Sequence, residues 1–129
     1  MTHPAPPDLT GYTLLPWPPR SKGGSGALMP VRGRIVKSGE HRQWVRAVQL
    51  WMRSLRWPLR TEPFRLDWEL VVPNLRARDA HDNCIGAVTD AGNGILWKDD
   101  SLAWRGEWGK SLDRTLQHPQ LWFRVREIE

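Results

Sequence analysis

The clearest hydrophobic pattern in the chain is an alternation of apolar and polar residues over positions 64–72. The apolar positions are Phe64, Leu66, Trp68, Leu70 and Val72, and the polar positions between them are Arg65, Asp67 and Glu69. Successive side chains of a β-strand point to opposite faces, so this pattern predicts a half-buried strand with its polar side toward solvent. Pro73 and Asn74 mark its end.

A second pattern, with the period of an α-helix, covers residues 38–57. Ser38 is suited to cap the N-terminus of this helix, and Pro58 stops it. One face carries Trp44, Val48, Trp51 and Leu55, and the opposite face carries Arg42, Arg46, Gln49, Arg53 and Arg56. Arginines without an intervening acid repel one another, so the second face is either a solvated surface or a binding surface for a polyanion.

The rest of the chain predicts shorter elements between glycines and prolines. Strands are expected over residues 12–16, 28–31, 34–37, 103–110 and 121–128, and the second and third of these would form a hairpin around Gly33. A second helix would begin at Asp82 or Asn83 and end near Ala91. The order of elements predicts a single α+β domain over residues 12–129, with a mixed β-sheet packed against two main helices. Residues 1–11 are predicted to be a flexible tail.

Composition narrows the class of protein. The chain has 129 residues, of which 40% are hydrophobic, as expected for one small domain. No apolar run approaches the roughly 18–20 residues of a transmembrane helix, and the N-terminus lacks the pattern of a secretory signal. Cys84 is the single cysteine, which excludes an intramolecular disulfide bond. We therefore expect a cytoplasmic protein that has no membrane partner.

The charge is unevenly distributed along the chain. The formal net charge is +5, yet residues 1–60 hold ten Lys and Arg against two acids, and residues 61–129 hold nine against twelve. Arginine is suited to bidentate contacts with phosphate, and the basic half favours a nucleic-acid partner. Arg20 and Lys22 stand in a segment rich in glycine and proline. This segment is either a flexible loop or a loop that contacts backbone phosphates.

Acidic residues gather between positions 76 and 100. They are Asp79, Asp82, Asp90, Asp99 and Asp100. Two carboxylates about 4 Å apart repel by about 4 kcal/mol at an effective dielectric constant of about 20. Such groups need a shared proton, a basic partner or a hard cation, and all-oxygen ligands favour Mg²⁺ or Mn²⁺. The alternative is structural: Asp82 would cap its helix, and Asp99 and Asp100 would be turn residues.

The segments RARDAHDN and ILWKDDS, in this order around a helix, resemble the RusA-like crossover junction endodeoxyribonucleases, the Holliday junction resolvases of lambdoid phages and many prophages. The early segment LPWPPRSK, Lys110 and the final LWFRVREI also fit this family. The resemblance spans about residues 12–128. It implies a Mg²⁺-dependent homodimeric nuclease, with no small-molecule cofactor, that nicks two opposing strands at a four-way DNA junction.

The resemblance also implies roles for individual residues. Asp79, Asp82 and Asp100 would be catalytic, and these three would hold the metal together with Asp99. The candidate DNA contacts are Arg20, Lys22, Arg42, Arg46, Arg53, Arg56 and Lys110. Asn83, His81 and Lys98 are candidate accessory residues.

Two departures from the family pattern leave alternatives open. Asp79 and Asp82 are three positions apart where the family has two, and Gly86 stands where the family has a functional lysine. Either another cation serves the site, or the chain is a junction- or DNA-binding protein with weakened or lost activity. A third hypothesis is a module that binds single strands by stacking bases on Trp104 and Trp108, which would share one face of a strand.

Overall fold

The computed structural model describes residues 4–19, 28–31, 34–37, 39–74 and 81–128, with side chains for most of them. A mixed sheet is built around β4 (Phe64–Val72), which pairs along one edge with the antiparallel β7 (Gln120–Glu127). The short β1 (Thr13–Leu14) continues the sheet beyond β7. Along the other edge of β4 run two parallel strands, β5 (Ala103–Arg105) and then β6 (Trp108–Leu112).

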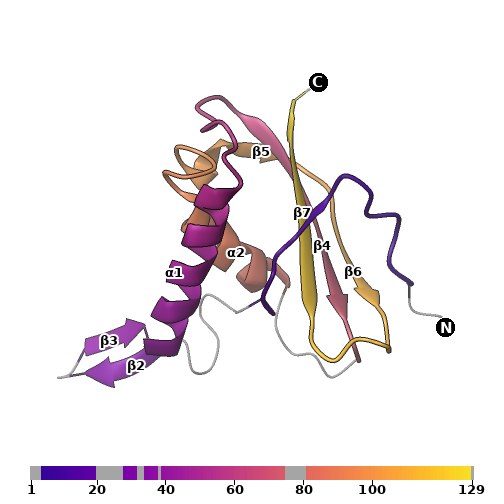
Figure 1. Ribbon diagram of the computed structural model, residues 1–129, viewed down its shortest axis with the longest axis horizontal. Helices are drawn as coiled ribbons and strands as arrows, with labels where there is room; N and C mark the ends of the chain where they lie inside the picture. Colours follow the sequence, from indigo (N-terminus) through magenta and orange to yellow (C-terminus); the bar gives the residue numbers. More distant parts are fainter. Residues whose placement is uncertain (1–3, 20–27, 32–33, 38, 75–80, 129) are drawn as a thin grey trace.

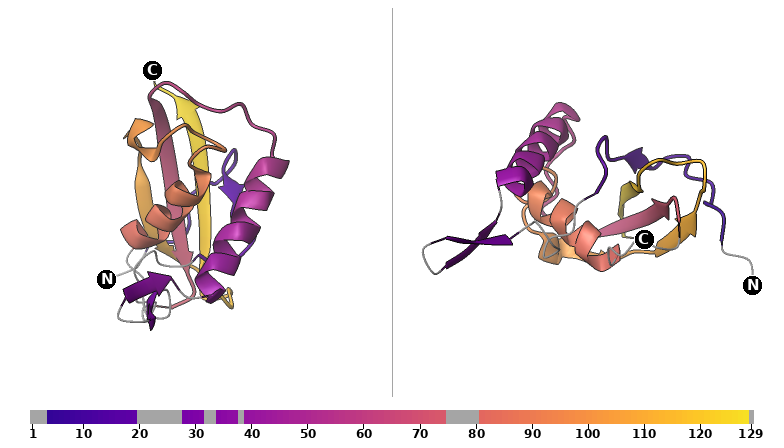
Figure 2. Two further views of the ribbon diagram at one scale, coloured as in Figure 1. Left: turned by 90° about the vertical axis from the view of Figure 1, so that its left-hand side faces the viewer. Right: turned by 90° about the horizontal axis from the view of Figure 1, so that it is seen from below.

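Two helices, α1 (Gly39–Ser54) and α2 (His81–Gly92), cover the same face of this sheet (Figures 1 and 2). The core lies between helices and sheet and includes Val48, Leu70, Val88 and Phe123. A 3₁₀-helix, η1 (Asp100–Leu102), leads from the turn after α2 into β5. The predicted fold class, one α+β domain with a mixed sheet and two main helices, is confirmed.

The predicted hairpin is also present. β2 (Leu28–Val31) and β3 (Arg34–Lys37) pair antiparallel, with Val31 opposite Arg34. The first helix ends three residues before the predicted Trp57, because Arg56 has a positive φ of 55° that no α-helix continues. Within the described residues, no helix is long and apolar enough to cross a membrane.

The bounds of β4 match the prediction, but its predicted solvent-facing side is wrong. Asp67 is fully buried, and Glu69 and Val71, which point to the same side, are also buried. The N-terminal segment runs along the side of the sheet away from the helices (Figure 1), and the carbonyl of Pro4 accepts a hydrogen bond from the N–H of Leu112 at 2.9 Å. The helices cover one face of the sheet and the N-terminal segment runs along the other. This explains why Asp67 and Glu69 are buried.

The strand predicted over residues 103–110 is interrupted, which corrects a single strand to β5 and β6. A side chain at Gly106 would collide with the backbone carbonyl of Leu66, so the chain passes against β4 where only glycine fits. Just beyond, the carbonyl of Glu107 accepts the N–H of Trp68 at 3.0 Å. The break leaves the N–H of Glu107 pointing toward β4, where it donates to the Asp67 side chain.

Candidate functional site

The turn after α2 returns the chain to that helix and brings acidic residues from two segments together. Gly92 lies against the Trp97 ring so closely that any side chain would overlap it, and Gly94 has a φ of 79°. The indole N–H of Trp97 donates to the carbonyl of Thr89 at 3.0 Å. This buried tryptophan fixes the turn, and Asp100, three residues further along the chain, reaches Asp90 in the last turn of α2.

Asp90, Asp99 and Asp100 form what we call the acidic site. The carboxyl group of Asp100 has the other two carboxyl groups as hydrogen-bonding neighbours. Burial raises the pKa of Asp100 above its ordinary value, and the carboxyl groups of Asp99 and Asp90 raise it further. In contrast, the N–H and hydroxyl of Ser101 lower the pKa of Asp99.

Part of the acidic site is structural, as one alternative from the sequence anticipated. Asp99 is the N-cap of η1, and its Oδ1 accepts the Ser101 N–H at 2.9 Å. Asp100 has no such capping bond among the described residues, and its neighbours are two more acids. The arrangement therefore concentrates negative charge that a shared proton or a hard cation would relieve.

The sequence placed Asp79 and Asp82 with Asp100, and the described residues do not test this grouping. Asp79 lies outside the described residues, as do the side chains of Asp82, His81 and Asn83. The backbone of Asp82 lies in the first turn of α2, about 12 Å along the axis from Asp90 at 1.5 Å per residue. Among the side chains that are described, no three His, Cys, Asp or Glu are arranged to hold a metal ion.

Asp90 was absent from the predicted site. The sequence did place it on one helical face with Asp82 and Gly86, at positions i, i+4 and i+8. That periodicity shows which face Asp90 occupies, but not that the chain after Gly92 folds back to this end of the helix. The tight turn held by Trp97 sets this path of the chain.

The candidate cations are spread over several elements. Lys98, next to Asp99, is exposed, and its backbone N–H donates to the carbonyl of Arg60 at 2.8 Å. Lys110 is exposed on β6, opposite Leu70 of β4. Gly86, at the family's lysine position, is half-buried in α2.

The predicted arginine face of the first helix is smaller than expected. Arg42, Arg46 and Arg53 are exposed along α1, and no carboxylate in the described part of the chain forms an ion pair with them. Arg56 lies beyond the end of the helix. Gln49 is half-buried and donates to the carbonyl of Ala91 in α2 at 3.4 Å, so it belongs to the contact between helices. Arg20 and Lys22 lie outside the described residues.

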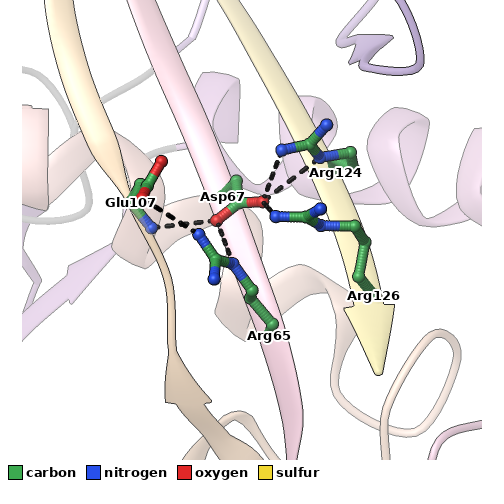
Figure 3. A network of polar contacts seen from close by, with 5 residues as sticks. All are labelled: Arg65, Asp67, Glu107, Arg124 and Arg126. Carbon is green, nitrogen blue, oxygen red and sulfur yellow. Dashed lines mark hydrogen bonds and ion pairs between the residues drawn. The ribbon is translucent and has the colours of Figure 1, made fainter. Parts of the chain in front are cut away.

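A second charged cluster was not anticipated from the sequence. Figure 3 shows the Asp67 carboxylate between three arginines of β4 and β7. Its Oδ1 accepts the Nε–H of Arg65 and the backbone N–H of Glu107, both at 2.9 Å. Its Oδ2 accepts an Nη2–H from Arg124 and one from Arg126, each at 2.9 Å. We call these five residues the Asp67 cluster.

The Asp67 cluster keeps its carboxylate ionised. Burial alone would raise the pKa of Asp67, but the Glu107 N–H and the guanidinium groups of Arg65 and Arg124 outweigh it and lower the pKa to about 2. Arg124 also lies over the ring of Tyr12, with its guanidinium carbon 4.5 Å from the ring centre. The cluster therefore ties the N-terminal segment to β7 and β4.

Trp104 and Trp108 lie on two strands, β5 and β6, and not on one strand as predicted. They are 62% and 57% exposed, and both line a shallow groove with Trp68 and residues of α2. The ring of Trp108 stacks on Trp68, with centroids 5.5 Å apart. Stacking on Trp68 thus accounts for the position of the Trp108 ring, and more than half of the residue's surface is exposed to solvent.

Searches with protein-family models and among curated proteins find no match to this chain.

Proposed function

We propose that this protein is a metal-dependent endonuclease that acts on branched DNA. One observation carries the proposal: carboxyl groups from α2 and from the turn before β5 converge at Asp100, where burial and neighbouring acids raise the pKa. Grouped carboxylates without an arginine partner are the ligand set that hard divalent cations favour. The resemblance to RusA-like resolvases, from residues at the same two places, supports the same chemistry.

Asp100 would hold Mg²⁺ or Mn²⁺ together with Asp79, Asp82 and Asp99, the ligand set that the resemblance implies. The three described carboxyl groups of the acidic site do not form a metal site by themselves. When bound, such a cation orients and activates water and stabilises charge on the scissile phosphate. Asp100 must give up its proton to become a ligand, so its raised pKa makes metal binding dependent on pH. Metal binding should strengthen as the pH rises through that pKa.

DNA would contact the exposed arginines of α1. Arg42, Arg46 and Arg53 have no carboxylate partner in the described part of the chain, and a phosphate backbone supplies the missing negative charge. A homodimer, which the resemblance implies, would present two such faces to the two equivalent strands of a four-way junction.

The test is cleavage of a labelled four-way junction by the full chain in Mg²⁺ and in Mn²⁺. Asp100→Asn should reduce nicking by at least about a hundred-fold, because it removes a charged ligand. Asp113→Asn is the matched control, since Asp113 caps its own exposed turn through Thr115 far from the acidic site along the chain. Equal nicking by wild type and Asp100→Asn, or none by either, contradicts the proposal.

Gly86 motivates a second candidate, a protein that binds junctions without cleaving them. It predicts steeply salt-dependent binding to the four-way junction without nicking. It also predicts no thermal stabilisation by Mn²⁺, whereas the nuclease should show a rise in melting temperature that Asp100→Asn abolishes. A thermal shift measurement with and without Mn²⁺ therefore separates the two candidates.

A further inference from the structure

Three arginines form a row across neighbouring strands on the side of the sheet away from the helices. The strand register places Arg65 of β4 opposite Arg126 of β7 and also opposite Arg105 of β5. Like charges directly opposite one another on paired strands are destabilising. A row of this kind therefore needs negative charge nearby, and we call these three residues the arginine row.

Asp67 neutralises only part of the row. It binds Arg65 and Arg126, but it also binds Arg124, so a single carboxylate serves three guanidinium groups. Glu107 forms an ion pair with Arg65 at 3.3 Å, yet its side chain is 81% exposed, which weakens that pair through solvent screening. Arg105 has no carboxylate partner within the described part of the chain; its Nη1 reaches only the carbonyl of Trp104, at 3.4 Å. The cluster thus keeps an excess of positive charge.

A cavity opens beside this excess charge. Arg65, Arg105 and Arg126 line it together with Glu127 and Ile128, and its volume is about 320 Å³. Each guanidinium group has more N–H donors than its bonds to Asp67 and Glu107 use. The Nε–H of Arg126 is buried without an acceptor among the described residues. Glu127 is exposed at the same cavity and offsets one positive charge.

We propose that this cavity binds a phosphate group. Guanidinium groups bind tetrahedral oxyanions through paired N–H donors, and three of them line one side of the cavity. Asp67 is a positioning residue here, since it holds Arg65 and Arg126 in place and so lowers the entropy lost when an anion binds. The phosphate is either a free ion or a phosphodiester of a nucleic-acid strand that passes over the β5 edge.

The site is independent of the proposed nuclease activity, because the arginine row and the acidic site share no residue. Binding is therefore measured without cleavage. Calorimetric titration of the full chain with inorganic phosphate at constant ionic strength should show saturable binding. Arg105→Gln should weaken it by roughly ten-fold, which corresponds to the loss of one charge-assisted interaction.

Arg105 is the residue to change because it is exposed and lies outside the bonds to Asp67, so the variant is expected to fold. Arg114→Gln, at another exposed arginine, is the matched control and should bind as wild type does. Arg126→Gln is a second variant, with circular dichroism to confirm folding, and it should weaken phosphate binding at least as strongly. Absence of binding above that of chloride, or equal loss in Arg105→Gln and Arg114→Gln, overturns the proposal.

A competition experiment identifies the source of the phosphate. If a fluorescent single-stranded oligonucleotide binds, is displaced by inorganic phosphate and is weakened by Arg105→Gln, the site takes a phosphodiester. If inorganic phosphate binds but Arg105→Gln leaves oligonucleotide binding unchanged, the site takes the free ion. Both outcomes support a phosphate site and differ in its occupant.

Discussion

Asp67 and Asp100 are the same side chain in opposite electrostatic surroundings. Asp67 lies among three guanidinium groups and a backbone N–H, and its pKa falls to about 2. Asp100 lies between two other carboxyl groups, and its pKa rises. Burial opposes ionisation at both places, so the neighbours decide the direction. The first arrangement stabilises the ionised carboxylate in the folded protein, and the second disfavours it.

The largest effect on stability is expected when Asp67, the stabilising member of this pair, is substituted. Asp67→Asn removes the buried negative charge and leaves three guanidinium groups facing one another. The free energy of unfolding should fall by about 3–5 kcal/mol, as when one partner of a buried ion pair is lost. Urea denaturation followed by tryptophan fluorescence measures it. Asp113→Asn keeps an oxygen acceptor for the two exposed bonds from Thr115 and should cost less than about 1 kcal/mol. An equally small loss in Asp67→Asn would contradict the structural role.

Acid should reproduce part of this loss without a substitution. The Asp67 pKa is lowered in the folded state from 3.8 to about 2, so its contribution is complete above pH 4 and is lost as the pH falls toward 2. The expected loss is about 2 kcal/mol. Denaturation curves at pH 5, 4, 3 and 2 measure it, and the Asp67→Asn variant should lack this component. Parallel pH profiles of the two proteins would show that Asp67 is not responsible.

At the acidic site, substitution of an aspartate is expected to change the free energy of unfolding in the opposite direction. A carboxyl group whose folded pKa is raised destabilises the protein above that pKa, because the unfolded state ionises more easily. In the absence of divalent metal, Asp100→Asn should therefore leave the free energy of unfolding unchanged or raise it by up to about 1 kcal/mol at pH 7. A loss of more than about 1 kcal/mol in urea denaturation would mean that Asp100 serves the fold.

The smallest effect on stability is expected at Arg105, just outside the Asp67 cluster. Arg105 lies in the arginine row but makes no bond to Asp67, so Arg105→Gln should change the free energy of unfolding by less than about 0.5 kcal/mol. Arg65→Gln breaks the 2.9 Å bond to Asp67 and should cost about 1–3 kcal/mol. Thermal denaturation of the two variants tests whether Arg65 contributes to stability and Arg105 does not.

The sequence predicted the bounds of helices and strands more accurately than the burial of their side chains. The alternation over residues 64–72 gave β4 its bounds, because period-two patterns follow directly from strand geometry. The same alternation misplaced Asp67, since its partners Arg124 and Arg126 lie 57 and 59 residues further along the chain. Gly106 was a usable signal for the interrupted strand, because glycine inside a strand pattern often marks a bulge or a close approach of two backbones.

The predicted metal site remains a prediction, and the structure adds Asp90 as a neighbour of Asp100. Composition and spacing brought out Asp99 and Asp100, which follow the helix closely. The approach of Asp100 to Asp90 depends on how sharply the chain reverses after Gly92. Local patterns do not contain that angle; the packing of Trp97 under the helix sets it.

The interruption between β5 and β6 has a consequence for association between molecules. An uninterrupted outer strand would offer a regular ladder of amide groups to which a foreign strand could add, a common route to aggregation. Here the ladder stops at Gly106, and the next amide is turned inward to Asp67. The hydrogen bond from the Glu107 N–H to Asp67 thereby shortens the run of unpaired backbone groups at this edge of the sheet. The edge is therefore poorly suited to the addition of another strand.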